Sequence, residues 1–139
     1  MASDSVVLSP EYVNFGRREA PADSAITTGT FVVYTPTGVA PATAATGARM
    51  VAVENIATAQ ELGYEYQADE NVFCQSLPSG CLLQMQGIDG TYAVGDVLEI
   101  GAGGKVTALA AGTPVAVIPY LAQGATLSGG EGSLIVELL

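Results

Sequence analysis

Residues 92–107 read YAVGDVLEIGAGGKVT, and this stretch decides the fold class. Residues 97–100 alternate between the two faces of a β-strand, with one face toward water. The glycines that follow predict a tight turn with positive φ, and strand character resumes at Lys105. The stretch therefore predicts a β-hairpin.

The same pattern of short strands and glycine-rich turns runs through the rest of the chain. Further strands are predicted at residues 30–35, 49–54, 72–76, 81–86, 115–120 and 133–138. Met50 and Ala52 should lie on one face of their strand, and Val51 and Val53 on the other. This spacing predicts an all-β, single-domain β-sandwich of jelly-roll-like form or a small β-barrel.

The 139 residues fit one domain, which we divide into an N-terminal arm at residues 1–28 and a β domain at residues 29–139. Two interpretations of the arm remain open: an extension that reaches a neighbouring subunit, or a first strand and loop of the same domain. Residues 36–48 predict a loop, and residues 56–70 hold at most one helical turn.

Cys74 and Cys81 flank a predicted β-turn at residues 77–80, and the hairpin it implies does not place the two sulfurs opposite each other. We expect two free, mostly buried thiols.

The charge balance excludes several classes of partner. The chain carries 14 acidic and 4 basic residues, has no histidine, and has a formal net charge of −10. Nucleic-acid binding needs clustered Lys and Arg, and an anionic membrane surface would repel such a chain. We therefore expect neither nucleic acid nor membrane as a partner. The sequence shows no recognisable targeting signal and no transmembrane helix.

The sequence also lacks the groups that most enzymes use. Without histidine it has no usual general base, and no G-x-S-x-G motif is present. Glu99 and Val106 stand where a phosphate-binding loop needs Gly and Ser or Thr. The acidic residues of the 61–70 segment match no EF-hand spacing, so we interpret them as a solvated loop. We expect a protein that is not an enzyme and that has no cofactor or metal.

Residues 92–107, the following GTPVAV strand at 112–117 and the apolar C-terminal strand resemble small capsid decoration, or cement, proteins of tailed bacteriophages. The resemblance covers about residues 80–139. It implies a homo-oligomer on the capsid exterior of a virion, made in the host cytoplasm, that clamps neighbouring subunits of the major capsid protein and stabilises the head.

Two sets of residues are predicted to make contacts with capsid or sister subunits. Aromatic and Arg side chains are enriched as interface anchors, which points to Tyr12, Phe15, Arg17 and Arg18. The run Leu134, Ile135 and Val136 is apolar on both faces of its strand, as is the run at residues 115–118. A partner subunit could cover the second face, so we expect self-association, with a homo-dimer preferred over a trimer.

The alternative function is a carbohydrate-binding or adhesion module on a virion or cell surface. Sugar binding usually uses exposed aromatic side chains, and Tyr64 and Tyr66 with Glu65 between them form the plausible site.

Overall fold

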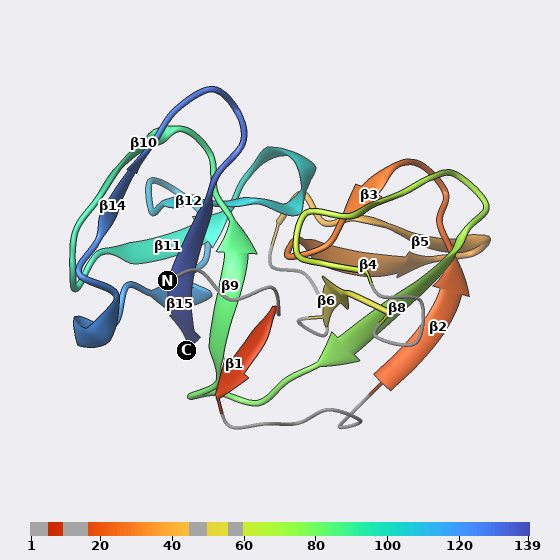
Figure 1. Ribbon diagram of the computed structural model, residues 1–139, viewed down its shortest axis with the longest axis horizontal. Helices are drawn as coiled ribbons and strands as arrows, with labels where there is room; N and C mark the ends of the chain where they lie inside the picture. The colour runs from red at the N-terminus through yellow and green to blue at the C-terminus, as the bar shows by residue number, and fades with distance from the viewer. Residues whose placement is uncertain (1–5, 10–16, 45–49, 56–59) are drawn as a thin grey trace.

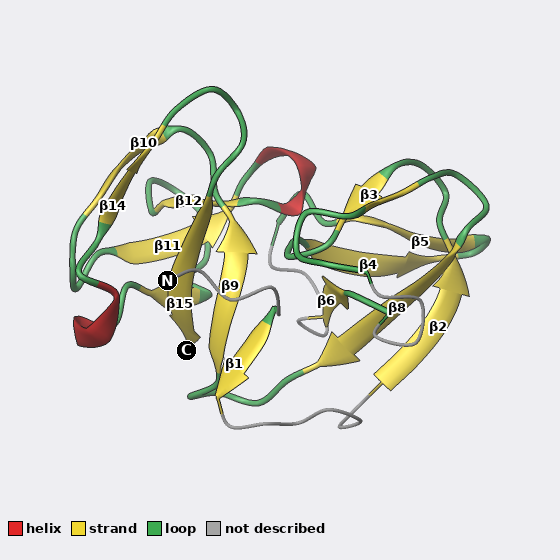
Figure 2. Ribbon diagram, in the orientation of Figure 1, coloured by secondary structure: helices red, strands yellow, loops and turns green. Residues whose placement is uncertain are grey.

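The computed structural model describes residues 6–9, 17–44, 50–55 and 60–139, and these form an almost purely β structure. Two larger sheets lie side by side, each with a small two-stranded ribbon (Figure 1). Short helical turns occur at η2 (Ala102–Gly104) and η3 (Tyr120–Ala122) (Figure 2). The predicted all-β fold is confirmed. Among the described strands no sheet closes into a barrel, so the predicted small β-barrel is not found.

The first sheet has six antiparallel strands in the order β1-β9-β15-β13-β11-β12. Their bounds are β1 Val7–Ser9, β9 Leu82–Gln86, β15 Ser133–Leu138, β13 Ala116–Val117, β11 Val97–Ile100 and β12 Val106–Ala108. The hairpin predicted from residues 92–107 is present as β11 and β12, with Ile100 opposite Val106. Its turn places Gly103 at φ 69° and Gly104 at φ 76°, as the glycines indicate.

The second sheet has five strands in the order β2-β8-β6-β4-β5 and curls so that its two edge strands meet at one end. The bounds are β2 Arg17–Pro21, β8 Asn71–Ser76, β6 Met50–Val53, β4 Phe31–Thr35 and β5 Gly38–Pro41. A bridge between Ala22 and Val39 joins the edges. The ribbons are β3 (Ile26–Thr27) with β7 (Glu65–Tyr66), and β10 (Gly90–Tyr92) with β14 (Ala125–Leu127).

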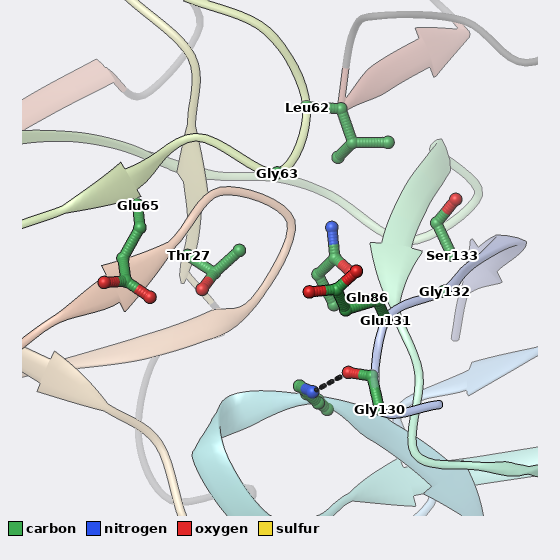
Figure 3. Close-up of a pocket in the computed structure, with 10 residues that line it drawn as sticks. Thr27, Leu62, Gly63, Glu65, Gln86, Gly130, Glu131, Gly132 and Ser133 are labelled. Atoms are coloured by element: carbon green, nitrogen blue, oxygen red, sulfur yellow. Dashed lines mark hydrogen bonds between the residues drawn. The ribbon is translucent and has the colours of Figure 1, made fainter. Parts of the chain in front are cut away.

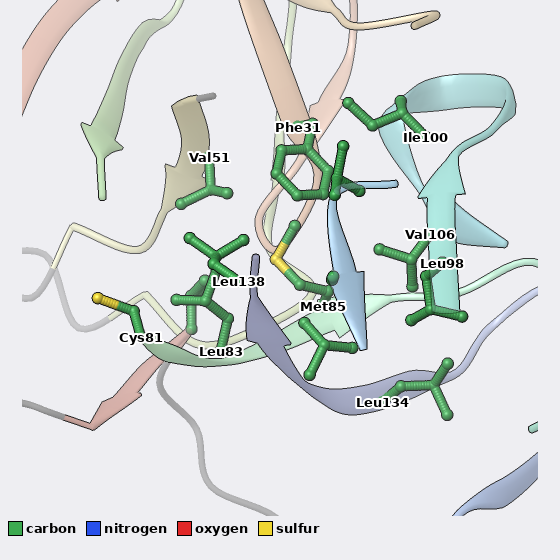
Figure 4. Close-up of a cluster of buried hydrophobic side chains, with 14 of the residues drawn as sticks. Phe31, Val51, Cys81, Leu83, Met85, Leu98, Ile100, Val106, Leu134 and Leu138 are labelled. Carbon is green, nitrogen blue, oxygen red and sulfur yellow. The ribbon is translucent and has the colours of Figure 1, made fainter. Parts of the chain in front are cut away.

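Strand β6 separates two hydrophobic cores. Its Val51 and Val53 belong to the larger core, which fills the space between the two sheets (Figure 4). Met50 and Ala52 face the smaller core, which the curled sheet encloses under the β3–β7 ribbon. All four side chains are buried, and their alternation between the two cores is the one predicted from the sequence.

The predicted hairpin around Cys74 and Cys81 is wrong. Strand β8 pairs with β2 and β6, whereas β9 pairs with β1 and β15, so the intervening segment crosses from one sheet to the other. The turn itself forms, with Gly80 at φ 90° and its N–H donating to the carbonyl of Leu138. A turn signal fixes the local backbone, but burial of Leu77 and Cys81 in the larger core decides which sheet the next strand joins.

Two further expectations differ from the structure. The predicted loop at 36–48 contains β5, because Val39 is buried in the smaller core and pairs with Tyr34 of β4. Residues 56–70 were expected to hold at most one helical turn and no strand, but β7 lies there at Glu65–Tyr66; residues 56–59 lie outside the described part. The ribbon β10–β14 had no counterpart in the prediction.

Within the described ranges, no helix has the length and apolar character that crossing a membrane requires.

The described part of residues 1–28 pairs with the rest of the domain. Strand β1 lies beside β9, β2 pairs with residues 71–75 of β8, and β3 joins β7. The side chain of Val6 is fully buried in the larger core. These residues therefore behave as strands of the same domain, the second of the two interpretations of this segment. Tyr12 and Phe15 lie outside the described residues.

Candidate functional site

The two predicted arginine contacts lie on β2, an edge strand of the five-stranded sheet, and their surroundings differ. The guanidinium of Arg17 lies over the ring of Phe73, 4.7 Å from its centroid, and Nη2 donates to the carbonyl of Glu54 across 3.2 Å. Arg18 is exposed, and its Nη1 donates to the carbonyl of Arg17. Arg17 is thus held by its own domain, and Arg18 offers its side chain to solvent.

Side chains of β15 alternate between the two faces of the sheet, so Leu134, Ile135 and Val136 do not form the single apolar contact that was predicted. Leu134 and Val136 are buried in the larger core together with Leu138, so they have no surface to offer a partner. Ile135 points to the opposite face and is half-buried. Within one chain only one face of β15 is covered by the core, and Ile135 alone of the three remains a candidate contact.

The outer face of the six-stranded sheet carries a hollow of about 270 Å³ beside Ile135. Ile135 pairs with Gln84 of β9 in the sheet, and both residues line this hollow. The Gln84 side chain is 5% exposed, and its Nε2 donates to Oγ of Ser133 across 3.0 Å. Its Oε1 is buried and has no hydrogen-bond partner among the described residues. An unpaired buried amide atom is uncommon and calls for an explanation.

Tyr120 stands beside this hollow as the most exposed large hydrophobic residue of the described chain, at 85%. It begins η3, and Ala122 of the same turn lines the hollow. The sequence offers a partial signal in the order Pro119, Tyr120 and Gly124, which indicates a turn that carries an aromatic residue. Sequence reasoning missed Gln84 because nothing local shows that its amide is buried.

A larger polar cleft of about 570 Å³ lies between the β3–β7 ribbon and the six-stranded sheet (Figure 3). Thr27 and Glu65 line one side, and Gln86 and the glycine-rich segment at residues 130–132 line the other. Lys105 also lines it, and its Nζ donates to the carbonyl of Gly130 across 2.9 Å. The lysine is therefore already held by the protein. The cleft has a wide, polar lining in which no set of residues forms a recognisable catalytic arrangement.

The tyrosine pair considered for sugar binding does not form an open platform. Tyr66 is 1% exposed and belongs to the smaller core, and the ring of Tyr64 meets it edge-on with centroids 5.2 Å apart. The hydroxyl of Tyr64 donates to Oε2 of Glu70, which raises the pKa of the tyrosine. Only Tyr64 presents partial surface, at 36%.

The described residues include no group of three or more His, Cys, Asp or Glu side chains close enough to hold a metal ion. Both cysteines are free and buried, as the sequence predicts. Burial raises the pKa of the Cys74 thiol to about 11 and raises that of Cys81 as well. Thiols of this kind are poor nucleophiles at neutral pH, because little thiolate is present.

Comparison with known proteins adds a relationship of fold. No family model matches the sequence, and no curated protein matches it. A solved structure, the base of the head fiber protein gp8.5 of bacteriophage phi29, is similar with a TM-score of 0.60. The similarity covers 88% of this chain and 92% of that chain, at 15% sequence identity. At this identity it shows that the two chains share a fold across nearly their whole length.

Proposed function

We propose that this chain is a structural protein of a phage virion, bound to the outside of the head, where it cements neighbouring subunits of the major capsid protein. The observation that carries the proposal is the shared fold with a phage head-fiber base over 88% of the chain. Residues 92–117 and the C-terminal strand independently resemble capsid decoration proteins. Fold alone does not fix function, so the proposal also depends on the chemical properties of the protein surface.

The described surface is suited to contacts with another protein. Arg18 and Glu19 are exposed on edge strand β2, and Tyr34 and Tyr120 expose aromatic rings on separate parts of the molecule. A net charge of −10 keeps free copies apart, so a capsid surface with basic patches is the complementary partner. Several weak contacts made at once give slow dissociation, and this is how a small clamp holds a shell together.

A second role within the same virion location is attachment, in which the chain anchors an appendage to the head. The fiber-base description of the structural neighbour favours it. The two roles differ in what loss of the protein does: a cementing protein protects the shell against pressure, whereas an anchor leaves the bare shell equally strong. The carbohydrate-binding alternative is not favoured, since Tyr66 is buried.

The test uses heads of the phage whose genome encodes this chain, prepared with and without the protein. We expect purified protein to co-sediment saturably with heads that lack it, and to raise the temperature or osmotic step at which DNA-filled heads burst. Binding without a change in that threshold would reject cementing and leave the anchor role. No binding to heads would reject the virion proposal itself.

A further inference from the structure

Strand β1 is held along one side only. Among the described strands it pairs with β9 alone, at the edge of the six-stranded sheet (Figure 1). Its two paired positions, Val7 opposite Leu83 and Ser9 opposite Leu82, are separated by a register shift, whereas β15 pairs with the other side of β9 at five successive positions. Short edge elements open locally at free energies well below that of global unfolding. We therefore expect β1 to leave β9 while the rest of the fold stays intact.

The groove that β1 fills makes three demands on the strand that occupies it. The carbonyl of Val6 accepts a hydrogen bond from the N–H of Gln84 across 2.7 Å, and the N–H of Val6 donates to Oε2 of Glu54 across 3.2 Å. The side chain of Val6 is fully buried in the larger core, and Glu54 is buried as well. Loss of β1 removes both hydrogen bonds and leaves a space in the core, which costs free energy. The vacated groove therefore favours an extended segment with an apolar residue at this position.

We propose that β1 is an exchangeable strand, so that residues 6–9 of a second copy of this chain occupy the groove on β9 in place of the chain's own. The existing β1–β9 interface selects this occupant, because the same residues of another copy can make every contact that β1 makes within its own chain. A strand added to a sheet edge gains affinity from main-chain hydrogen bonds and specificity from a side-chain pocket, here that of Val6. Exchange of an identical element is a low-cost route to self-association, and it does not depend on the proposed virion function.

The length and charge of the chain determine the strength of this association. Residues 10–16 join β1 to β2 and span at most about 25 Å, so the chain's own strand competes at an effective concentration on the order of 1 mM. Exchange replaces one interface by an identical one, and the dissociation constant between copies is therefore also on the order of 1 mM. Each copy carries a net charge of −10, and salt screens the repulsion with a Debye length of about 8 Å at physiological ionic strength. Association is accordingly stronger at high salt.

The first test measures binding of a fluorescent peptide of residues 1–12 to the full chain. Val6→Asp removes the apolar anchor of the chain's own strand, so its groove should be open and should bind the peptide about 10-fold more tightly than the wild type does. Val94→Asp is the matched control, because it adds the same charge at a 44% exposed valine and should bind like the wild type. A peptide that itself carries Val6→Asp should not bind. A Val6→Asp chain that is folded by circular dichroism but binds no peptide, or a control that binds equally tightly, would overturn the proposal.

The second test is sedimentation equilibrium of the full chain at low and high NaCl. The wild type should self-associate weakly at millimolar concentration and more strongly at high salt, and Val6→Asp should stay monomeric. Absence of self-association in the wild type at every concentration, or self-association that Val6→Asp leaves unchanged, would reject a second copy as the occupant.

Hydrogen exchange of the wild type tests the opening of β1 without any substitution. The amide of Gln84 donates to Val6 of β1, and the amide of Leu138 donates to Cys81 within the same sheet. If β1 opens locally, the Gln84 amide should exchange about 100-fold faster than that of Leu138. Equal exchange rates would show that β1 leaves only when the whole domain unfolds, and strand exchange would then be excluded for the folded protein.

Discussion

The hydroxyl of Tyr66 donates a hydrogen bond to the backbone carbonyl of Val53 across 2.8 Å. Tyr66 is 1% exposed and lies in the smaller core, whereas the side chain of Val53 lies in the larger one. The bond therefore ties the β3–β7 ribbon to β6, the strand that both cores share.

Tyr66→Phe is expected to lower the free energy of unfolding by about 1–2 kcal/mol, because it removes a buried hydrogen bond and keeps the ring. Tyr66→Ala should cost about 3–5 kcal/mol, since it also empties the centre of the smaller core. Urea unfolding measures both. The control is Tyr64→Phe, whose hydroxyl bonds to Glu70 at the surface and whose loss should stay within about 0.5 kcal/mol. Equal effects of the two Phe variants would contradict the assigned role of Tyr66.

Gly103 and Gly104 form a matched pair in the β11–β12 turn. Both have positive φ, at 69° and 76°, but a Cβ on Gly103 meets open space whereas one on Gly104 overlaps the carbonyl oxygen of Phe31. Gly103→Ala should cost about 1–2 kcal/mol from the left-handed backbone alone. Gly104→Ala should cost a further 1–3 kcal/mol or so, because the turn must move away from β4. Thermal unfolding of the two variants compares them directly, and equal melting temperatures would show that the turn does not pack on β4.

Arg17 and Arg18 are predicted to differ although they are neighbours of the same type. Arg17→Ala removes the contact with Phe73 and the hydrogen bond to Glu54, at a cost of about 1–2 kcal/mol. Arg18→Ala removes only an exposed contact, so the change in stability should stay within about 0.5 kcal/mol. Chemical unfolding gives both values. If Arg18→Ala is the more destabilising change, the described environment of β2 is contradicted.

Stability should fall in alkaline solution because of two buried groups. Burial raises the pKa of Cys74 from 9.0 to about 11 and that of Tyr66 from 10.0 to about 12. Each group loses its proton earlier in the unfolded chain than in the folded one, so folding stability is complete below about pH 9 and declines as pH rises toward 12.

Cys74→Ala should reduce the part of this decline that begins near pH 9, to which the raised pKa of Cys81 also contributes, as measured by urea unfolding at a series of pH values. The two thiols should also react with a thiol reagent only after unfolding, since Cys74 is 0% and Cys81 is 1% exposed. They lie in different cores, so no disulfide should form between them in the folded protein. Rapid labelling at neutral pH would contradict their burial.

Local sequence was sufficient for several elements. The alternation in residues 97–100 and the glycines after it predict the β11–β12 hairpin, and the alternation of Met50 to Val53 predicts the two faces of β6. These signals are local: side chains alternate along any strand, and glycine adopts positive φ wherever a turn requires it. The sequence alone likewise shows that the chain has no histidine.

Strand pairing was decided only by the tertiary structure. Nothing local distinguishes a hairpin at Cys74 and Cys81 from a crossing between sheets, because hydrogen bonds between strands join residues far apart in the chain. The same holds for Leu134 and Val136, whose apolar run shows that they can be buried but not that their own core covers them. The sequence thus determined several of the strands and turns of this protein, among them β6 and the β11–β12 hairpin. The packing of two sheets around two cores decided which side chains remain on its surface, including Ile135 and Tyr120.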